Sequence, residues 1–326
     1  LVLEARNLNK TSGTFINTIM KHCRKDGRIH SHINQIRSDD GGTVSGRISM
    51  SNPNLQQIPA RDPVIGPMIR SLFLPEEGEQ WAAIDFSQQE PRILVHYAHV
   101  YGKMRGVELD ACQEFVDGYN NNPDMDFHTM VAEMANISRK QAKTINLGMM
   151  YGMGVNKLSE QMDIEVSEAK ALVKQYHSRV PFVKGLMQGV TNRLNDKASA
   201  GSIRSILGRK CRFDLWEPDT FSMNKALPYR EAIKEYGETT RLKRAYTYKA
   251  LNRLIQASAA DMTKKAMVDI YKSGRLPMLQ VHDELAMSVK DRAEAEEVSK
   301  IMVGAVPLEV PSQCDIEIGP SWGEAK

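Results

Sequence analysis

The chain has 326 residues, of which 41% are hydrophobic and 25% are charged, and its formal net charge is +3 at pH 7. This length can build two or three cooperating subdomains around a sizeable core, and the composition excludes a disordered chain. No apolar run approaches the ~20 residues that span a bilayer, and the first ten residues lack a signal-peptide pattern. We therefore expect a soluble, intracellular protein with no membrane partner.

Neither the cysteines nor the net charge indicates a ligand. The cysteines form no CxxC pair and no zinc-ligand spacing, so we expect reduced structural thiols. They are Cys23, Cys112, Cys211 and Cys314. The net charge is too small to indicate a polyanion partner, and the basic run 21–28 is by itself typical of a solvated face.

The first third of the chain alternates between helix, loop and strand patterns. Residues 1–25 read as helical. Residues 28–61 are rich in Ser, Gly, Asn and Pro, which predicts loops and short strands. The segment 80–87, QWAAIDFS, predicts an apolar strand that ends in a carboxylate.

A helical block follows and ends in a hairpin. Residues 95–200 carry helical periodicity, with start signals at Ser138, Ser167 and Pro181. The segment 201–213, GSIRSILGRKCRF, reads as a β-hairpin.

The last third returns to strand patterns. The polar segment 214–245 is hard to place, whereas 245–274 predicts one long helix that Gly274 ends. Alternating apolar residues predict a strand over 279–289, and Asp291 begins a further helix. We therefore expect an α+β fold in which a helical block is inserted between two strand-bearing segments.

Two carboxylates lie in the apolar strands, Asp85 at the end of one and Asp283 within the other. Adjacent strands would bring them together. Mg²⁺ favours oxygen ligands on rigid supports, and two such ions ~3.5–4 Å apart can stabilise both the attacking and the leaving oxygen of a phosphoryl transfer. The alternative is that each is an ordinary strand-end or turn aspartate.

The segment 139–154, RKQAKTINLGMMYGMG, predicts a helix with a functional stripe. Four side chains follow one another at four-residue steps along it: Arg139, Lys143, Leu147 and Tyr151. Cations followed by an aromatic suit a nucleoside triphosphate. Gly148 and Gly152 indicate that something approaches the backbone closely. An amphipathic helix with a basic rim is the alternative.

Three long segments resemble motifs A, B and C of the family A DNA polymerases, the DNA polymerase I group, in the same order. They are 82–98 (AAIDFSQQEPRILVHYA), 139–154 and 279–289 (LQVHDELAMSV). The likeness extends to 44–61, 126–134 and 250–262, and so covers nearly the whole chain. The ending GPSWGEAK and the segment 214–245 look more like the phage branch than the bacterial one.

The resemblance implies a right-hand polymerase, with a palm built on an antiparallel sheet with helices and with mostly helical fingers. It assigns 1–27 to the end of the thumb, 28–97 to the palm with motif A, 98–245 to the fingers with motif B, and 246–326 to the palm with motif C. The start at LVLEARNLNK also implies that most of the thumb, and any exonuclease domain, lie outside this chain.

The implied activity is that of a template-directed DNA polymerase, a nucleotidyltransferase. It adds deoxynucleoside monophosphates from dNTPs to a primer 3′-OH with two Mg²⁺ ions. The implied setting is DNA replication, of a phage on the finer placement, in the cytoplasm of a bacterial or phage-infected host cell. Template-primer DNA and dNTPs are the implied partners, and the sequence does not identify a processivity factor.

The resemblance also assigns site residues. Metal ligands are Asp85, Asp283 and the backbone carbonyl of Phe86. Catalytic roles beyond metal binding fall to Lys143, as general acid for the leaving pyrophosphate, and to Glu284 as a supporting acid. The nucleotide-binding residues are Arg139, Lys143, Leu147, Tyr151, Glu90, His128 and Gln88. The DNA-binding residues are Arg47, Asn54, Asn252, Gln256 and His282. Glu90 matches the residue that fills the space of a ribose 2′-hydroxyl.

Two departures and two rival classes stay open. Pro91 replaces a usual leucine and removes a backbone donor at a strand end, and Leu147 stands where the family usually has Phe or Tyr. A single-subunit phage RNA polymerase would share both aspartates but lacks the gate glutamate, so Glu90 favours DNA synthesis. A catalytically silent DNA-binding or scaffold protein would be expected to lose a metal ligand or Lys143, and all of these residues are present.

Overall fold

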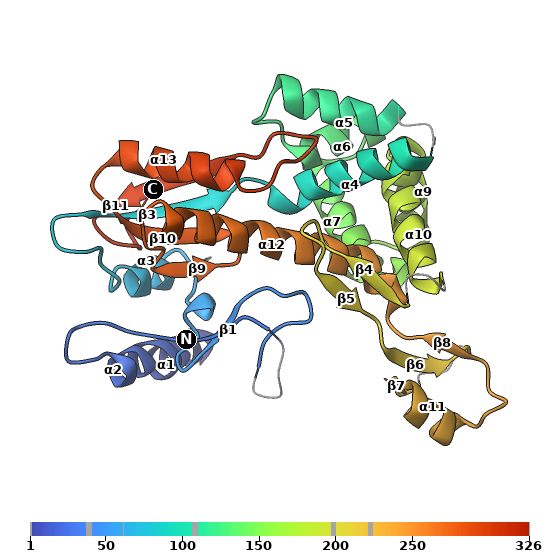
Figure 1. Cartoon of the computed structure of the whole chain (residues 1–326), viewed down its shortest axis with the longest axis horizontal. Coiled ribbons are helices and arrows are strands. Elements are labelled where there is room, and N and C mark those ends of the chain that lie inside the picture. The colour runs from blue at the N-terminus through green and yellow to red at the C-terminus, as the bar shows by residue number, and fades with distance from the viewer. Residues whose placement is uncertain are drawn as a thin grey trace. The chain divides into compact units, whose positions relative to one another are not determined.

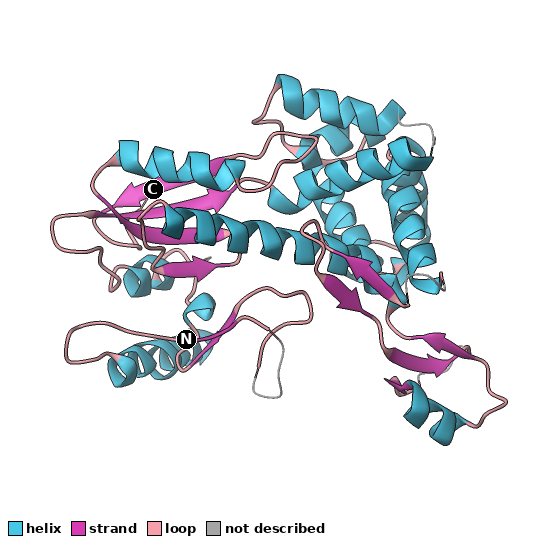
Figure 2. Ribbon diagram, in the orientation of Figure 1, coloured by secondary structure: helices cyan, strands magenta, loops and turns pink. Residues whose placement is uncertain are grey.

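The computed structural model describes residues 2–36, 41–60, 62–105, 110–196, 200–220 and 224–325. The chain divides into two compact units that take alternating stretches of the sequence. Unit 1 consists of Leu1–Gln89, Ala259–Pro307 and Ser312–Lys326, and unit 2 of Glu90–Ser258 and Leu308–Pro311. The expected α+β arrangement, a helical block between two strand-bearing segments, is confirmed (Figure 2). The division into thumb, palm and fingers stays a prediction.

Unit 1 is built on a four-stranded antiparallel sheet (Figure 1). In spatial order its strands are β11 (Cys314–Gly319), β3 (Gln80–Phe86), β10 (Glu284–Val289) and β9 (Leu279–Val281). The central strand β3 is almost entirely apolar because side chains cover both of its faces. β11 was not predicted from the sequence.

The two faces of this sheet are covered differently. Helix α13 (Arg292–Gly304) packs on one face and contacts β3, β10 and β11 through its buried side chains. Asp291 caps its first turn by accepting a hydrogen bond from the Glu294 amide at 2.9 Å, which confirms the predicted start. The other face carries an apolar cluster that includes Trp81, Ala83 and Trp322. Alternation along β3 then directs Asp85 to the same face as this cluster.

The N-terminal part of unit 1 is helical and then irregular, as predicted. Its elements are α1 (Val2–Lys10), a π-helical stretch (Thr11–Ile16), α2 (Asn17–His22), the hairpin strands β1 (His32–Asn34) and β2 (Ser49–Ser51), a 3₁₀ turn (Leu55–Gln57) and α3 (Ile65–Arg70).

Unit 2 is mostly helical. In chain order its elements begin with α4 (Gln89–Arg105), whose first residue still belongs to the first stretch of unit 1. The others are α5 (Asp110–Asn121), α6 (Phe127–Ala135), α7 (Arg139–Met150), α8 (Val155–Met162), α9 (Val166–Arg179), α10 (Pro181–Asn195), and the predicted hairpin β4 (Ser202–Arg204) and β5 (Lys210–Arg212). Ser138 caps α7 in a capping box with Gln141, and Pro181 is the first residue of α10. The start predicted at Ser167 is wrong by a residue or two, because α9 already begins at Val166.

The predicted long helix is α12 (Ala250–Lys272). Its residues up to Ser258 belong to unit 2, and those from Ala259 onward belong to unit 1. The helix begins later than predicted because a 3₁₀ turn (Thr247–Lys249) precedes it. Gly274 follows its end with a φ of +86°, the conformation that favours glycine there.

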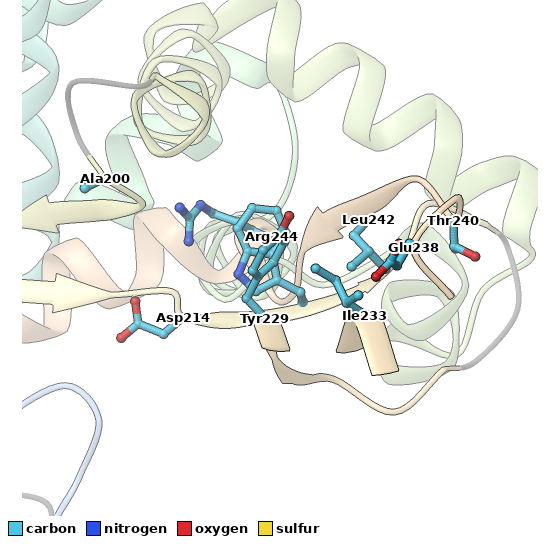
Figure 3. Close-up of a pocket in the computed structure, with 9 residues that line it drawn as sticks. Ala200, Asp214, Tyr229, Ile233, Glu238, Thr240, Leu242 and Arg244 are labelled. Carbon is cyan, nitrogen blue, oxygen red and sulfur yellow. The ribbon is translucent and has the colours of Figure 1, made fainter. Parts of the chain in front are cut away.

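The polar segment 214–245 forms a small module of its own. It contains a three-stranded sheet in the order β7 (Leu227–Pro228), β6 (Leu215–Pro218) and β8 (Leu242–Arg244), and the helix α11 (Tyr229–Tyr236). The module contains a pocket of about 490 Å³. Tyr229, Leu242 and Arg244 are among the side chains that line it (Figure 3). The Arg244 guanidinium lies 4.5 Å from the centre of the Trp216 ring and donates to the Phe213 carbonyl at 2.8 Å. The side chain that lines the pocket therefore also ties β8 to the end of the preceding hairpin.

Two general expectations can be compared with the structure. All four cysteines are free thiols. Within the described residues, no helix combines the length and the apolar character needed to cross a membrane.

Candidate active site

The turn between β9 and β10 carries Asp283. Val281 pairs with Glu284 across the hairpin, so His282 and Asp283 form a two-residue turn. The prediction of one unbroken strand over 279–289 is therefore wrong, and Asp283 lies at an end of the sheet. His282 has a φ of +59°. A left-handed residue other than glycine costs about 1–3 kcal/mol and persists where its surroundings hold it in place.

Two glutamine side chains hold this turn. Gln280, which is 5% exposed, donates from Nε2 to the His282 carbonyl. Gln56 in turn donates from Nε2 to Oε1 of Gln280 at 3.0 Å. The Phe86 amide also donates to the Asp283 carbonyl at 3.5 Å, which ties the end of β3 to the turn. The backbone at Asp283 is thus fixed from two sides.

A row of acidic residues crosses the sheet at this end. Asp85 lies opposite Glu284 on β10 and opposite Asp315 on β11. Burial, followed by the negative charges of Asp283, Glu284, Asp315 and Glu317, raises the pKa of Asp85 to about 8. Without a counter-cation, Asp85 therefore holds a proton at neutral pH.

The pKa values of the other two buried acids shift in the same direction. Burial raises the pKa of Asp283, and the positive charges of Arg47 and His282 offset part of that rise. Burial also raises the pKa of Glu284, and the charge of Arg70 offsets part of it. Two predicted DNA-binding residues, Arg47 and His282, thus lie close enough to Asp283 to influence it. The role of Arg70 was not predicted, because a lone arginine on a short helix carries no motif.

This acidic group fits a divalent cation. Buried carboxylate oxygens, Oδ1 of Asp85 and Oε1 of Glu284, have no hydrogen-bond partner among the described residues. A cation would neutralise the charges that raise the pKa of Asp85. Across the described part of the chain, no three His, Cys, Asp or Glu residues are grouped as a complete metal site. A site with only one or two protein carboxylates suits Mg²⁺, because its other ligands are usually water and substrate phosphates.

In unit 2, the predicted stripe lies on α7 and at its end. Arg139, Lys143 and Leu147 are helical, and Tyr151 is the residue that follows the last turn, with its amide donating to the Leu147 carbonyl at 2.9 Å. Lys143 is exposed and Leu147 half-buried. The predicted helix is confirmed over Arg139–Met150 but ends before Tyr151 and Gly152, and the triphosphate role stays a prediction.

Arg139 is held by Asp126. Its Nε and Nη2 donate to the two carboxylate oxygens of Asp126 at 3.1 and 2.9 Å. Asp126 also caps α6 by accepting from the Thr129 amide at 2.7 Å. Burial would raise the pKa of Asp126, but hydrogen bonds from Arg139 and Thr129 outweigh it and lower that pKa to about 2. The sequence contained a signal for the cap, an Asp three residues before Thr, but none for the ion pair.

His128 lies beside Asn146, one turn of α7 beyond Lys143. Nδ2 of Asn146 is 3.0 Å from Nδ1 of His128. Burial lowers the pKa of His128, and the positive charges of Lys143 and Arg139 lower it further, against the opposing charge of Asp126. Of the sequence-predicted residues, His128, Arg139 and Lys143 therefore lie close to one another. Asn146 was not predicted, because a single buried asparagine in a helix carries no signal of its own.

The predicted gate residue Glu90 lies in the first turn of α4. The Tyr151 hydroxyl donates to its Oε2 at 3.4 Å. Pro91 lies in the same first turn rather than at a strand end, so its missing N–H is one that a helix start leaves unpaired in any case. Gly152 has a φ of +68°, and a side chain there would lie 2.8 Å from the Tyr248 carbonyl oxygen. The close approach predicted at Gly152 thus comes from the chain itself.

The remaining predicted residues lie in both units. Gln88 joins β3 to α4 with a φ of +50°. Asn54 accepts from the Gln56 amide at 3.1 Å and so caps the 3₁₀ turn. Asn252 and Gln256 lie four residues apart on α12, and both are half-buried.

Comparisons with known proteins agree over the length of the chain. The family model described as DNA polymerase family A matches residues 1–324. The DNA-directed DNA polymerase of Pseudomonas phage M6 is 37% identical over 368 residues, which cover 100% of this chain and 51% of that protein. The thermostable DNA polymerase I of Thermus aquaticus is 33% identical, over 100% of this chain and 36% of its own length.

A solved structure is also similar. The POL domain of Pol1 from M. smegmatis, in complex with DNA primer-template and dNTP, is 29% identical to the chain, with a TM-score of 0.76. The match covers 99% of this chain and 53% of that one. The chain thus spans about half the length of the phage relative and of this structure.

Proposed function

The chain belongs to DNA polymerase family A, and from that membership we propose that it is a template-directed DNA polymerase. It extends a primer 3′-OH with deoxynucleoside monophosphates taken from dNTPs. Its fold is the α+β fold of a polymerase domain, with an antiparallel sheet and a helical block. We assign the sheet to the palm, the block that carries α7 to the fingers and the N-terminal helices to the end of the thumb. We also propose a role in phage DNA replication, which the phage relative supports.

The observation that carries the proposal is the pair Asp85 and Asp283 at one end of the sheet, where Oδ1 of Asp85 and Oε1 of the neighbouring Glu284 are buried without a hydrogen-bond partner among the described residues. In the proposal these two carboxylates and the Phe86 carbonyl hold Mg²⁺. When bound, the metal supplies stabilisation for the attacking and leaving oxygens of a phosphoryl transfer. Glu284, next to Asp283 and opposite Asp85, adds negative charge that favours the cation.

The basic residues of α6 and α7 bind the nucleotide in this proposal. Arg139 and His128 contact the triphosphate, and Lys143 gives a proton to the leaving pyrophosphate. Their position on two packed helices supports a shared target, because α6 and α7 present these groups together. Leu147 and Tyr151 continue the stripe toward the sugar and base, and Gln88 is a further nucleotide contact.

Selection against ribonucleotides is assigned to Glu90. Its carboxylate receives a hydrogen bond from the Tyr151 hydroxyl at 3.4 Å, which restrains the side chain. A restrained side chain can exclude a 2′-hydroxyl by occupying its volume.

Template-primer binding is assigned to Arg47, Asn54, Asn252, Gln256 and His282. Amide and guanidinium donors can contact phosphates and the minor-groove acceptors that every base pair offers, so these contacts report pairing without reading sequence.

A primer-extension assay tests the proposal. We expect extension with dNTPs and Mg²⁺, little with ribonucleotides, and none in EDTA. Ribonucleotides used as well as dNTPs would favour the RNA polymerase alternative. Template-primer binding without any extension at high enzyme and primer concentration would favour a silent DNA-binding protein and overturn the proposal.

A further inference from the structure

We propose that Asn146 is a positioning residue that sets the tautomer of His128, so that the imidazole presents an Nε2–H donor to the triphosphate of the incoming nucleotide. The inference rests on the proposed function, in which His128 contacts that triphosphate. It adds a role for a buried side chain that is not among the predicted site residues.

The hydrogen bond between the two residues determines the tautomer. Nδ2 of Asn146 lies 3.0 Å from Nδ1 of His128. With Nδ2 of Asn146 facing the ring, as it is assigned here, the amide can only donate, so Nδ1 accepts and carries no proton. A neutral imidazole with a bare Nδ1 has its proton on Nε2. The remaining ring nitrogen is then a donor, which is what a phosphate oxygen requires.

The surroundings favour the neutral form of this imidazole. Burial, followed by the cations Lys143 and Arg139, lowers the pKa of His128, and the carboxylate of Asp126 offsets only part of that. A neutral ring carries one proton, and the nitrogen that holds it decides whether Nε2 can donate to a phosphate oxygen. If the proton moved to Nδ1, the lone pair of Nε2 would face the phosphate oxygens and repel them.

The amide of Asn146 has no evident role in packing. The residue is 1% exposed, and its neighbours Ala142, Ile145 and Met149 on the buried side of α7 are apolar. Its Oδ1 has no hydrogen-bond partner among the described residues, and the contact with His128 is the hydrogen bond that Nδ2 makes. Burying an amide in apolar surroundings is unfavourable unless its hydrogen bonds are made. A polar group that contributes so little to the fold points to a role toward His128.

NMR spectroscopy of the full chain with ¹⁵N-labelled histidine tests the tautomer directly. Two-bond ¹H–¹⁵N correlations report which ring nitrogen is protonated, and His128→Gln assigns the signal. At pH 7.5 we expect the wild-type ring to be neutral and protonated on Nε2. Asn146→Leu, which keeps the volume and removes the donor, should release this preference. Asn146→Asp, which can only accept, should move the proton to Nδ1 or make the ring cationic.

The spectra can overturn the proposal without reference to activity. A wild-type ring protonated on Nδ1, or spectra that are unchanged in both Asn146 variants, would do so. Circular dichroism establishes that the variants fold, and two variants of opposite chemistry keep the test open if one of them does not. Ile145→Val, one residue away and fully buried, controls for loosened packing of α7.

A double-mutant cycle on the KM for dNTP tests the consequence. His128→Ala should raise this KM about 10- to 100-fold, the range for a hydrogen bond to a charged group. Asn146→Leu should raise it in the wild-type background and by less than about twofold in the His128→Ala background. Equal increases in both backgrounds would overturn the positioning role. An unchanged KM in His128→Ala would overturn the contact with the triphosphate, while the spectra decide separately whether Asn146 places the proton.

Discussion

Asp85 lies directly opposite Glu284 in the antiparallel register of β3 and β10. Like charges at directly opposed positions of a sheet destabilise it, and Asp315 on β11 opposes Asp85 from the other side. The sheet therefore tolerates an unfavourable row of carboxyl groups at the end where Asp283 lies. Such an arrangement is expected where a cation is to be bound, and it leads to the first two predictions.

Asp85→Asn and Asp283→Asn should each lower the rate of primer extension by about 10³-fold or more, since bound metal ions supply several kcal/mol to a phosphoryl transfer. Asp315→Asn is the matched control, because this carboxylate also opposes Asp85 but is exposed. It should change the rate by only a small factor. Single-nucleotide extension measured at saturating dNTP checks this. Near-normal activity in either of the first two variants would contradict the metal assignment.

The row of carboxyl groups around Asp85 predicts that the stability of the metal-free protein depends on pH. The pKa of Asp85 is about 8 in the folded protein, against about 3.9 in an unfolded chain. The folded state thus binds the proton more tightly, so this group's contribution to stability is complete below about pH 4 and is lost as pH rises toward 8.

Asp85→Asn removes the ionisable carboxyl group, so the variant should not lose stability in this way as the pH rises. Between pH 6 and 9 in EDTA, the Tm of wild type should fall more steeply than that of the variant, and at pH 8 the variant should be the more stable. Added Mg²⁺ should stabilise wild type more than the variant. Thermal unfolding followed by circular dichroism measures both effects, and parallel pH profiles would show that Asp85 is ionised without metal.

Asp126 has two separable roles. Asp126→Asn keeps a side chain that can cap α6 but loses the charge that holds Arg139, whereas Asp126→Ala loses both. Because Arg139 is largely exposed, the ion pair should contribute at most ~1 kcal/mol to the free energy of unfolding. The lost cap in Asp126→Ala should cost a further ~1 kcal/mol. Urea denaturation of the three proteins checks this order, and equal stability of the two variants would argue against the cap.

Glu90→Ala should raise the ratio of ribo- to deoxynucleotide incorporation, because it opens room for the 2′-hydroxyl. Tyr151→Phe should raise it less, since it removes only the hydrogen bond that holds the carboxylate. Competition between the two nucleotide types on one primer measures the ratio. A ratio unchanged in Glu90→Ala would give the RNA polymerase alternative new support.

Leu147 should influence selection at the sugar 3′ position. It lies half-buried on α7, between Lys143 and Tyr151 in the stripe, and its branched side chain offers neither a flat face nor a hydroxyl. Leu147→Phe and Leu147→Tyr should therefore shift the use of dideoxynucleotides relative to deoxynucleotides by different factors. Chain-termination assays provide the measurement. The same ratio in all three proteins would indicate that Leu147 only fills space.

Long elements and strong caps could be predicted from the sequence. The strand β3 and the helix α12 are long enough for their periodicity to stand out, and Ser138 and Asp291 begin helices as their side chains indicated. The module 214–245 could not be predicted, because strands of two to four residues are too short to show an alternation of apolar and polar residues. β11 alternates apolar and acidic residues and could have been found by the alternation rule.

The hairpin over 279–289 shows how an alternation pattern can mislead. Apolar residues at 279, 281, 285, 287 and 289 read as one face of one strand. Because Val281 pairs with Glu284, these two residues share a face, and Leu285 points to the opposite one. The two-residue turn thus transfers the apolar positions from one face to the other. The residue with the positive φ in this turn is His282, and a histidine, unlike a glycine, does not predict such a conformation from the sequence.

The central position of β3 determines when the sheet can form during protein synthesis. Both strands that pair with β3 lie far downstream, and about 200 residues separate its end at Phe86 from the start of β10 at Glu284. At ~5–20 residues per second, an apolar strand waits on the order of 10–40 s for its first partner to leave the ribosome. Unit 2 lies almost wholly within Glu90–Ser258 and is complete by then except for four residues. The helical block can therefore fold on the ribosome before the sheet does, and the exposed β3 segment is where nascent chains would associate if synthesis stalled.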